Sequence, residues 1–190
     1  SRLIIAGSTW PRDEAVVIPG FRELLKAHRD ARLVIVPHEP SLERVSRIGR
    51  ALASHGLTHT CLSGLDESRK FEADVLIADG VGYLAELYGA GALAYVGGGF
   101  TSGVHNILEP AVIGLPVLFG PRTGNAWEAS RLAALGAAST VTSPERFTTE
   151  AGRFLGDREL LRSAGGAARK FVADRAGAAR GAAAMIGRFL

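Results

Sequence analysis

The chain has 190 residues, 47% of them hydrophobic, and a formal net charge of +3. This length suits one domain of ordinary size, and the apolar fraction excludes an intrinsically disordered chain. The single cysteine excludes a disulfide framework and a cysteine-based zinc site, and no apolar run approaches the ~20 residues of a membrane-spanning helix. Because the only methionine is Met185, we expect the sequence to be a fragment or an excised domain.

Short apolar runs alternate with amphipathic helical patterns along the chain. The runs that predict strands are 3–6, 33–36, 58–62, 75–78, 92–96, 116–119 and 138–141. Most of them are apolar at consecutive positions, which is typical of strands buried on both faces of a parallel sheet. Helices are predicted over 11–28, 41–55, 83–88, 106–113, 125–135 and 144–155. The alternation predicts an α/β fold with a doubly wound, Rossmann-like parallel sheet.

After residue 141 the pattern changes to a helical tail rich in Ala, Gly and Arg. We therefore divide the chain into a Rossmann-like domain, 1–143, and a helical extension, 144–190, packed on the same domain. Gly165-Gly166 and Gly177 are predicted to divide the extension into two or three helices. From Glu150 onward it holds eight Arg or Lys and four acidic residues, which a solvated helix face explains. Attraction to anionic lipid is a weaker alternative, and nucleic acid is not expected because no aromatic platform accompanies the arginines.

In a doubly wound sheet, ligands bind in a crevice at the carboxyl ends of the strands. The loops predicted to line that crevice are 7–10, 37–40, 79–82, 97–106 and 120–125. The fourth loop holds four glycines within seven residues, namely Gly97, Gly98, Gly99 and Gly103. Glycine lets a ligand approach the main chain closely, although a tight turn before an ordinary capped helix is the alternative explanation.

A helix is predicted to start near Asn106, and its first free N–H groups would form an anion site. Ser102, His105 and Asn106 add side-chain donors there, and Glu109 lies about one turn into the helix. This arrangement suits a phosphate at the helix start, with a sugar hydroxyl beside the carboxylate of Glu109.

The first loop carries Ser8 and Thr9, which either cap the next helix or donate to a ligand. Trp10 either lines the crevice or packs under it. Asp13 and Glu14 in the first turn of that helix favour the helix but repel a phosphate. The helix at Asn106 is therefore the better phosphate site.

The third loop reads Gly-x-Gly-x-x-Ala after a strand, which resembles a nicotinamide fingerprint. That fingerprint requires an acidic residue at the end of the following strand, where this chain has only glycines. Backbone contact of Gly80, Val81 and Gly82 with a nucleobase fits better.

His38 and His105 are the histidines that fall in predicted crevice loops, and His105 is as readily a structural residue as a ligand contact. Arg122 either holds a carboxylate or phosphate or is simply solvated. Asn125 is either a ligand contact or a helix cap. The chain has no His-Glu-x-x-His, Asp-x-Asp or Gly-x-Ser-x-Gly, so we expect no metal, no cofactor and no catalytic triad.

Several motifs together resemble one family. They are Ala6-Gly-Ser-Thr-Trp10, Asp79–Leu84, Val96-Gly-Gly-Gly99, Gly103-Val-His-Asn-Ile-Leu-Glu-Pro-Ala111 and Gly114-Leu-Pro-Val-Leu-Phe-Gly-Pro121. In this order and spacing the chain resembles the carboxyl-terminal, donor-binding domain of 3-deoxy-D-manno-octulosonic acid (Kdo) transferases, which have the two-domain GT-B glycosyltransferase fold. Three positions depart from the commonest family pattern, namely the Pro37–Pro40 loop, which lacks an arginine, Tyr83 and Arg122.

The resemblance implies inverting, metal-independent transfer of Kdo from CMP-Kdo to a lipid A precursor at the cytoplasmic face of the bacterial inner membrane. It places Ser102, Gly103 and Asn106 at the donor phosphate, Glu109 at the ribose, and the loop 80–82 at the cytosine. The general base and the acceptor surface would belong to an amino-terminal domain absent from this chain, as would any membrane contact. We therefore expect this chain alone to bind donor without turnover.

Two alternatives remain open at this point. One keeps the fold and changes the donor to a UDP-sugar, in another GT-B transferase or an epimerase. The other is a non-catalytic nucleotide-binding or protein-interaction domain.

Overall fold

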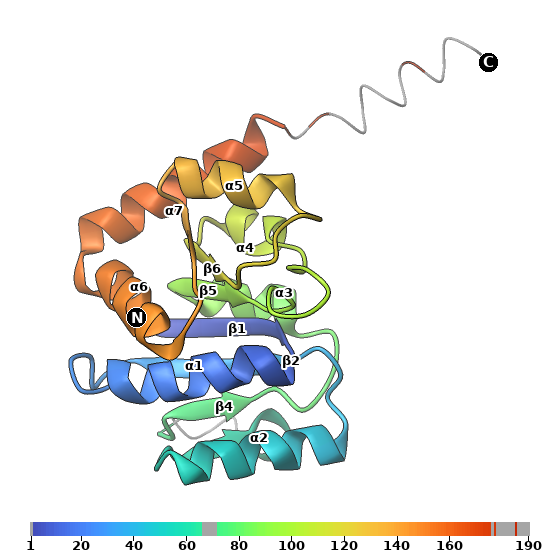
Figure 1. Ribbon diagram of the computed structural model, residues 1–190, viewed down its shortest axis with the longest axis vertical. Coiled ribbons are helices and arrows are strands. Elements are labelled where there is room, and N and C mark those ends of the chain that lie inside the picture. The colour runs from blue at the N-terminus through green and yellow to red at the C-terminus, as the bar shows by residue number, and fades with distance from the viewer. Residues whose placement is uncertain (1, 66–71, 176, 178–184, 186–190) are drawn as a thin grey trace.

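The computed structural model describes residues 2–65, 72–175, 177 and 185, and its centre is a parallel sheet covered by helices on both faces (Figure 1). The seven strands lie in the order β3-β4-β2-β1-β5-β6-β7, and every pairing between them is parallel. Their bounds are β1 Leu3–Thr9, β2 Arg32–Pro37, β3 His59–Cys61, β4 Val75–Ile77, β5 Leu93–Val96, β6 Val117–Phe119 and β7 Ala138–Thr140. The doubly wound α/β fold predicted from the sequence is confirmed.

The helices are α1 Pro11–Leu24, α2 Leu42–Ser54, α3 Leu84–Ala90, α4 Leu108–Ile113, α5 Trp127–Ala134, α6 Pro144–Gly156 and α7 Arg158–Ala173, with a short 3₁₀ turn, η1, at Leu62–Gly64. Helices α1, α2 and α6 bury their apolar stripes against one face of the sheet, and α3 covers the other. Helices α4, α5 and α7 enclose a separate apolar cluster over β6 and β7. Consecutive apolar residues in the strands supply both faces with buried side chains, as the sequence pattern predicts.

The prediction that Gly165-Gly166 divides the tail is wrong, because α7 runs unbroken through both residues. Gly165 is needed for close packing: a Cβ there would collide with the carbonyl oxygen of Gly114, at the end of α4. Arg169 donates from Nη2 to the Ile113 carbonyl at 2.6 Å, which satisfies one of the free carbonyls at that end of α4. Gly177 lies beyond α7, and most of the rest of the tail lies outside the described residues.

Helices α6 and α7 pack against the sheet domain. Thr148 on α6 donates its hydroxyl to the Gly20 carbonyl of α1 at 2.9 Å, and Gly20 leaves room for Phe147. The division into 1–143 and 144–190 remains a prediction, since part of the second range lies outside the described residues.

Three helix ends differ from the prediction by two residues or more at positions near the site or its supporting helix. Helix α1 ends at Leu24, four residues before His28, in a hydrogen-bonded turn. Helix α4 begins at Leu108 rather than Asn106, and α5 begins at Trp127 rather than Asn125. The side chains before these helices are engaged in other bonds: Asn106 accepts from the Leu108 amide at the start of α4, and Asn125 donates to the Val104 carbonyl in the loop after β5.

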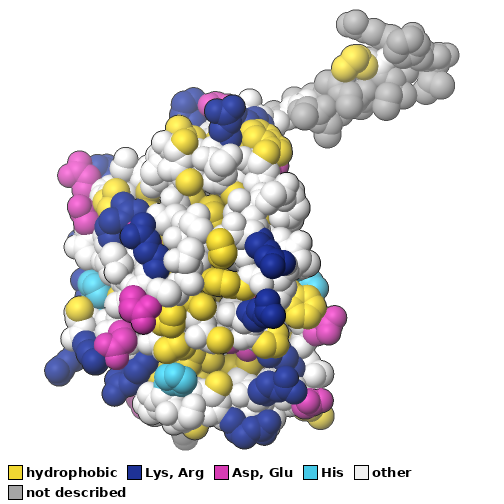
Figure 2. Space-filling view, in the orientation of Figure 1, with side chains coloured by type: hydrophobic (Ala, Val, Ile, Leu, Met, Phe, Trp, Pro, Cys, Tyr) yellow, Lys and Arg dark blue, Asp and Glu magenta, His cyan; other side chains and the backbone are white. Residues whose placement is uncertain are grey.

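Within the part of the chain that the structure describes, no helix is long and apolar enough to cross a membrane. On the face shown in Figure 2, the basic side chains lie in several separate places with acidic side chains among them.

Candidate functional site

The site expected from the topology lies where β1 and β5 are neighbours, because the chain continues from them toward opposite edges of the sheet. Main-chain bonds join the ends of these strands. The Gly97 amide donates to the Gly7 carbonyl at 2.9 Å, and the His38 amide donates to the Thr9 carbonyl at 3.0 Å. The loops after β1, β2 and β5 therefore form one continuous edge of the crevice.

The loop after β5, residues 97–105, is named the glycine turn here. The Gly98 carbonyl accepts from the amides of Thr101 (2.9 Å) and Gly103 (3.1 Å), and the His105 amide closes the turn on the Gly97 carbonyl (2.9 Å). Gly98 and Gly103 have φ of 92° and 119°, which side chains rarely adopt. Packing explains two further glycines, since a Cβ on Gly97 or Gly99 would collide with the backbone of a neighbouring loop. These glycines are thus required by the fold itself.

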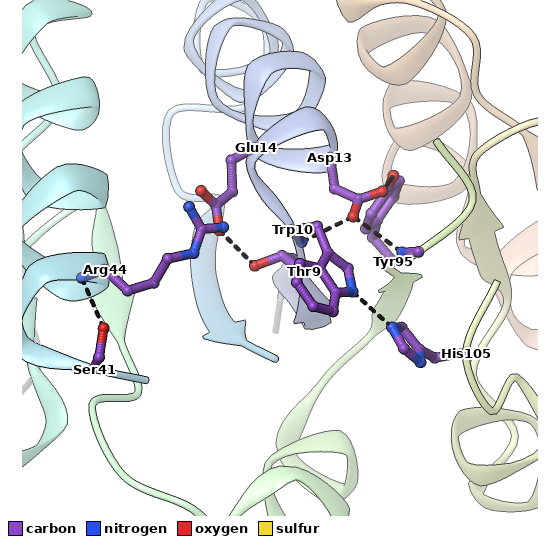
Figure 3. A network of polar contacts seen from close by, with 9 residues as sticks. Thr9, Trp10, Asp13, Glu14, Ser41, Arg44, Tyr95 and His105 are labelled. Carbon is purple, nitrogen blue, oxygen red and sulfur yellow. Dashed lines mark hydrogen bonds and ion pairs between the residues drawn. The ribbon is translucent and has the colours of Figure 1, made fainter. Parts of the chain in front are cut away.

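Asp13, in the first turn of α1, anchors the glycine turn through its side chain. Its fully buried carboxylate accepts from the Tyr95 hydroxyl (2.7 Å), the Gly98 amide (3.0 Å) and the Trp10 amide (2.9 Å) (Figure 3). Burial, with Asp13 adding to it, raises the pKa of Tyr95 far above its usual range, so this hydroxyl remains a donor. The sequence does not predict this role of Asp13, because a contact 85 positions away leaves no local signal.

Trp10, His38 and His105 form a stack over the crevice, named the aromatic stack here. The imidazole centroids are 4.5 Å apart and nearly parallel, and His38 lies 4.8 Å from the indole. Trp10 donates from Nε1 to Nε2 of His105 at 2.8 Å (Figure 3). Burial and the neighbouring His38 hold the pKa of His105 below its usual value, although Asp13 opposes them. Trp10 is half-buried and contacts the histidines of two crevice loops.

Thr9, at the end of β1, belongs to a buried polar network with Glu14 and Arg44. Thr9 donates its hydroxyl to Glu14 at 2.8 Å, and Arg44 from α2 pairs with the same carboxylate at 2.5 Å (Figure 3). Burial raises the pKa of Glu14 to about 7, despite the lowering effects of Arg44 and Thr9. The Nη1 atom of Arg44 is buried without a hydrogen-bond partner among the described residues. Neither Ser8 nor Thr9 caps α1, whose N-cap is Trp10.

Ser8 has φ of 52°, the one positive value among the described non-glycine residues. It falls where the register between β1 and β2 shifts, between Gly7 and Thr9. Left-handed backbone at a non-glycine residue is strained and is often found at functional sites. The strain at Ser8 turns the chain so that Thr9 enters the interior and Trp10 reaches the crevice.

The proposed phosphate position at Asn106 is partly occupied by the chain itself. The Oδ1 atom of Asn106 accepts from the Leu108 amide at 3.1 Å, and Nδ2 donates to Glu109 at 3.0 Å. The amides of Asn106 and Ile107 donate to no acceptor among the described residues. Asn106, Glu109 and Ser102 are exposed. The predicted proximity of Asn106 and Glu109 is confirmed, and two main-chain donors remain available beside them.

Arg122 and Asn125 support the glycine turn from the loop after β6. Arg122 donates from Nη1 to the Thr101 carbonyl (2.7 Å), and its own carbonyl accepts from the Val104 amide (3.0 Å). Asn125 donates from Nδ2 to the Val104 carbonyl (2.8 Å). Of the two alternatives for Asn125, the helix cap is excluded, since the N-cap of α5 is Ala126. A hollow of about 330 Å³ beside them is lined by Val104, His105, Asn106, Ile107, Leu108, Asn125, Ala126 and Glu128.

The loop 80–82 lies at a different hollow, of about 580 Å³, between η1 and α3. Gly80 and Tyr83 line it, and Gly82 has φ of 92°. Val81 is 78% exposed. Among the described residues no hydrogen bond joins this loop to the glycine turn. The structure thus brings the glycine turn, the aromatic stack, Asn106 and Glu109 together, whereas the loop 80–82 opens to a separate hollow.

Comparison with known proteins identifies the fold and the family. No protein-family model matches the chain. A 140-residue stretch, 72% of the chain, is 34% identical to the 3-deoxy-D-manno-octulosonic acid transferase of Chlamydophila psittaci. The chain is a domain related to the Kdo transferases. The chain spans about a third of the length of that relative, 31%.

Solved structures agree on the fold. The C-terminal CMP-Kdo binding domain of WaaA from Acinetobacter baumannii has a TM-score of 0.79 to this chain, with 90% of this chain and 89% of that chain covered at 22% identity. Anabaena Alr3699/HepE in complex with UDP-glucose has a TM-score of 0.65, covering 92% and 44% at 13% identity. The chain therefore has the fold of the carboxyl-terminal, Rossmann-like half of a GT-B glycosyltransferase.

Proposed function

We propose that this domain binds the nucleotide sugar CMP-Kdo and that, with an amino-terminal acceptor domain, it transfers Kdo to a lipid A precursor. The observation that carries the proposal is the 34% identity to a Kdo transferase over 72% of the chain. A stretch of that length in a chain of 190 residues necessarily includes the glycine turn and Asn106. The likeness therefore covers the part of the crevice where the phosphate is proposed to bind.

In this proposal the phosphate of the donor binds at the amides of Asn106 and Ile107, which have no acceptor among the described residues. The exposed hydroxyl of Ser102 adds a side-chain donor, and Glu109 accepts from the ribose. Amides held in place by a rigid turn stabilise developing negative charge on a leaving phosphate without reorganisation. Gly80, Val81 and Gly82 are proposed to contact the cytosine through their backbone.

Some of the remaining candidate residues already make hydrogen bonds within the protein, and others are exposed. Thr9, Arg122 and Asn125 are engaged with Glu14, Thr101 and Val104 respectively. We propose that they support the site without touching the donor. His38 is exposed and stacks on His105. We propose that His38 is the basic side chain that approaches the anionic sugar.

The test is calorimetric titration of the chain with CMP and with UDP. The proposal predicts that CMP binds more tightly than UDP. A preference for UDP would assign the domain to a UDP-sugar enzyme, and no binding of either nucleotide would favour a non-catalytic role.

A charge introduced at position 106 provides a sharper test. Asn106→Asp keeps an acceptor for the Leu108 amide and adds a negative charge where the phosphate is proposed. We expect CMP affinity to fall at least tenfold, because like charges disfavour each other at this range. Ser163→Asp, on the exposed surface of α7, adds the same charge and is expected to leave affinity unchanged.

A further inference from the structure

The hydrogen bond between Trp10 and His105 fixes where the imidazole carries its proton. The indole N–H is a donor and has no acceptor capacity, so Nε2 of His105, 2.8 Å away, must be the acceptor. An accepting Nε2 carries no hydrogen. The neutral ring therefore has its proton on Nδ1, and the imidazolium form is incompatible with this bond.

The surroundings hold the ring in one orientation. The edge with Cδ2 and Nε2 faces the glycine turn, since a Cβ on Gly98 would lie 2.8 Å from Cδ2 and 3.1 Å from Nε2. His38 covers one face of the ring at 4.5 Å. Trp10 is itself fixed, because its amide donates to the buried carboxylate of Asp13. A ring flip would replace the acceptor Nε2 by a carbon and lose the indole bond.

The charges that face His105 come from two other elements. His38, from the loop after β2, disfavours a proton on His105, and Asp13, from α1, favours one. Burial adds to the effect of His38 and keeps the pKa of His105 below its usual value. The indole bond acts in the same direction, since protonation at Nε2 would break it.

We propose that Trp10 is a positioning residue that holds His105 as the neutral tautomer with its proton on Nδ1, so that His105 offers the donor phosphate a hydrogen bond and no charge. This inference rests on the proposed function, because it takes the phosphate to bind beside Asn106. His105 and Asn106 line the same hollow of about 330 Å³, so a ligand there meets both residues.

The test is a two-bond ¹H–¹⁵N correlation spectrum of the histidine rings in the free chain. We expect a protonated Nδ1 and an unprotonated Nε2 for His105, with a pKa below its usual value. In Trp10→Phe the ring loses the indole donor at Nε2, so its pKa should rise toward the usual value of about 6.5 and Nε2–H should appear. CMP affinity of this variant at pH 8 should fall about fivefold, the loss of one ordinary hydrogen bond.

Trp127→Phe is the matched control, because Trp127 is the other tryptophan, is 57% exposed, and packs against Phe171 on α7. It should leave the His105 signals and CMP affinity unchanged. A proton on Nε2 in the unmodified chain, or unchanged His105 signals in Trp10→Phe, would overturn the inference. The spectrum of the unmodified chain decides the tautomer even if Trp10→Phe fails to fold. It also needs no ligand, so a failure of CMP to bind counts against the proposed function and not against the tautomer.

Discussion

Asp13 offers the sharpest test of how the crevice is built, because one buried carboxylate accepts three hydrogen bonds from three different segments. Asp13→Asn keeps the size of the side chain and replaces one oxygen by an amide. The other oxygen still accepts, but at least one of the donors at Tyr95, Gly98 and Trp10 loses its acceptor. All three bonds lose their charge.

The magnitude follows from the contacts. A hydrogen bond to a charged group contributes about 1.5–3 kcal/mol and a neutral one about 0.5–1.5 kcal/mol, so each of three bonds weakens by about 1 kcal/mol. Asp13→Asn should therefore lower the free energy of unfolding by about 3–4 kcal/mol, a large part of the ~5–15 kcal/mol of a typical domain. Tyr95→Phe removes one partner and should cost about 2 kcal/mol.

The assay is urea unfolding followed by circular dichroism for both single variants and for the double variant. Because Asp13 and Tyr95 share a bond, the double variant should lose at least 1 kcal/mol less than the sum of the two. Thr148→Val, which removes the bond to the Gly20 carbonyl farther along α1, should add to Asp13→Asn within about 0.5 kcal/mol. Additive losses for Asp13 and Tyr95, with less than 1 kcal/mol for Asp13→Asn, would refute the idea that this carboxylate anchors the glycine turn.

Three further predictions concern other parts of the domain. Gly103→Ala places a Cβ against the Asn125 amide at φ of 119° and should weaken CMP binding at least tenfold, by calorimetry; unchanged affinity would show that the turn does not shape the site. Because the folded-state pKa of Glu14 is about 7 against an ordinary 4.5, the folded chain binds this proton more tightly than the unfolded chain. Stability should thus fall by about 3 kcal/mol as pH rises from about 4.5 to 8, and Glu14→Gln should remove that part of the slope in urea unfolding. Gly165→Leu, which forces α7 away from Gly114, should cost about 1–3 kcal/mol, whereas Gly166→Leu, with open space around it, should cost much less in the same assay.

The sheet was predictable because the burial of its strands is visible in the sequence as runs of apolar residues. Runs such as 33–36 and 92–96 are apolar at consecutive positions, and only a strand covered on both faces uses such a run in a parallel sheet. The division of the tail at Gly165 was not predictable. In a sequence, a glycine that ends a helix cannot be distinguished from one that allows a neighbouring helix to pack closely. The role of Gly165 becomes clear only from the structure, where the Gly114 carbonyl lies against it.

The position of the site was predictable from the sequence, but the long-range hydrogen bonds within it were not. The crevice loops follow from the strand order, and Asn106 and Glu109 are three residues apart, so their contact is local. The anchor at Asp13 and the indole bond to His105 join residues 85 and 95 positions apart. Contacts of that range depend on how helix and sheet pack, and no spacing in one sequence encodes them.

The most direct test of the account is a crystal structure of the domain with CMP bound. The account predicts the phosphate within hydrogen-bonding distance of the amides of Asn106 and Ile107, with the ribose beside Glu109. A phosphate held elsewhere, with both amides left to solvent, would contradict it.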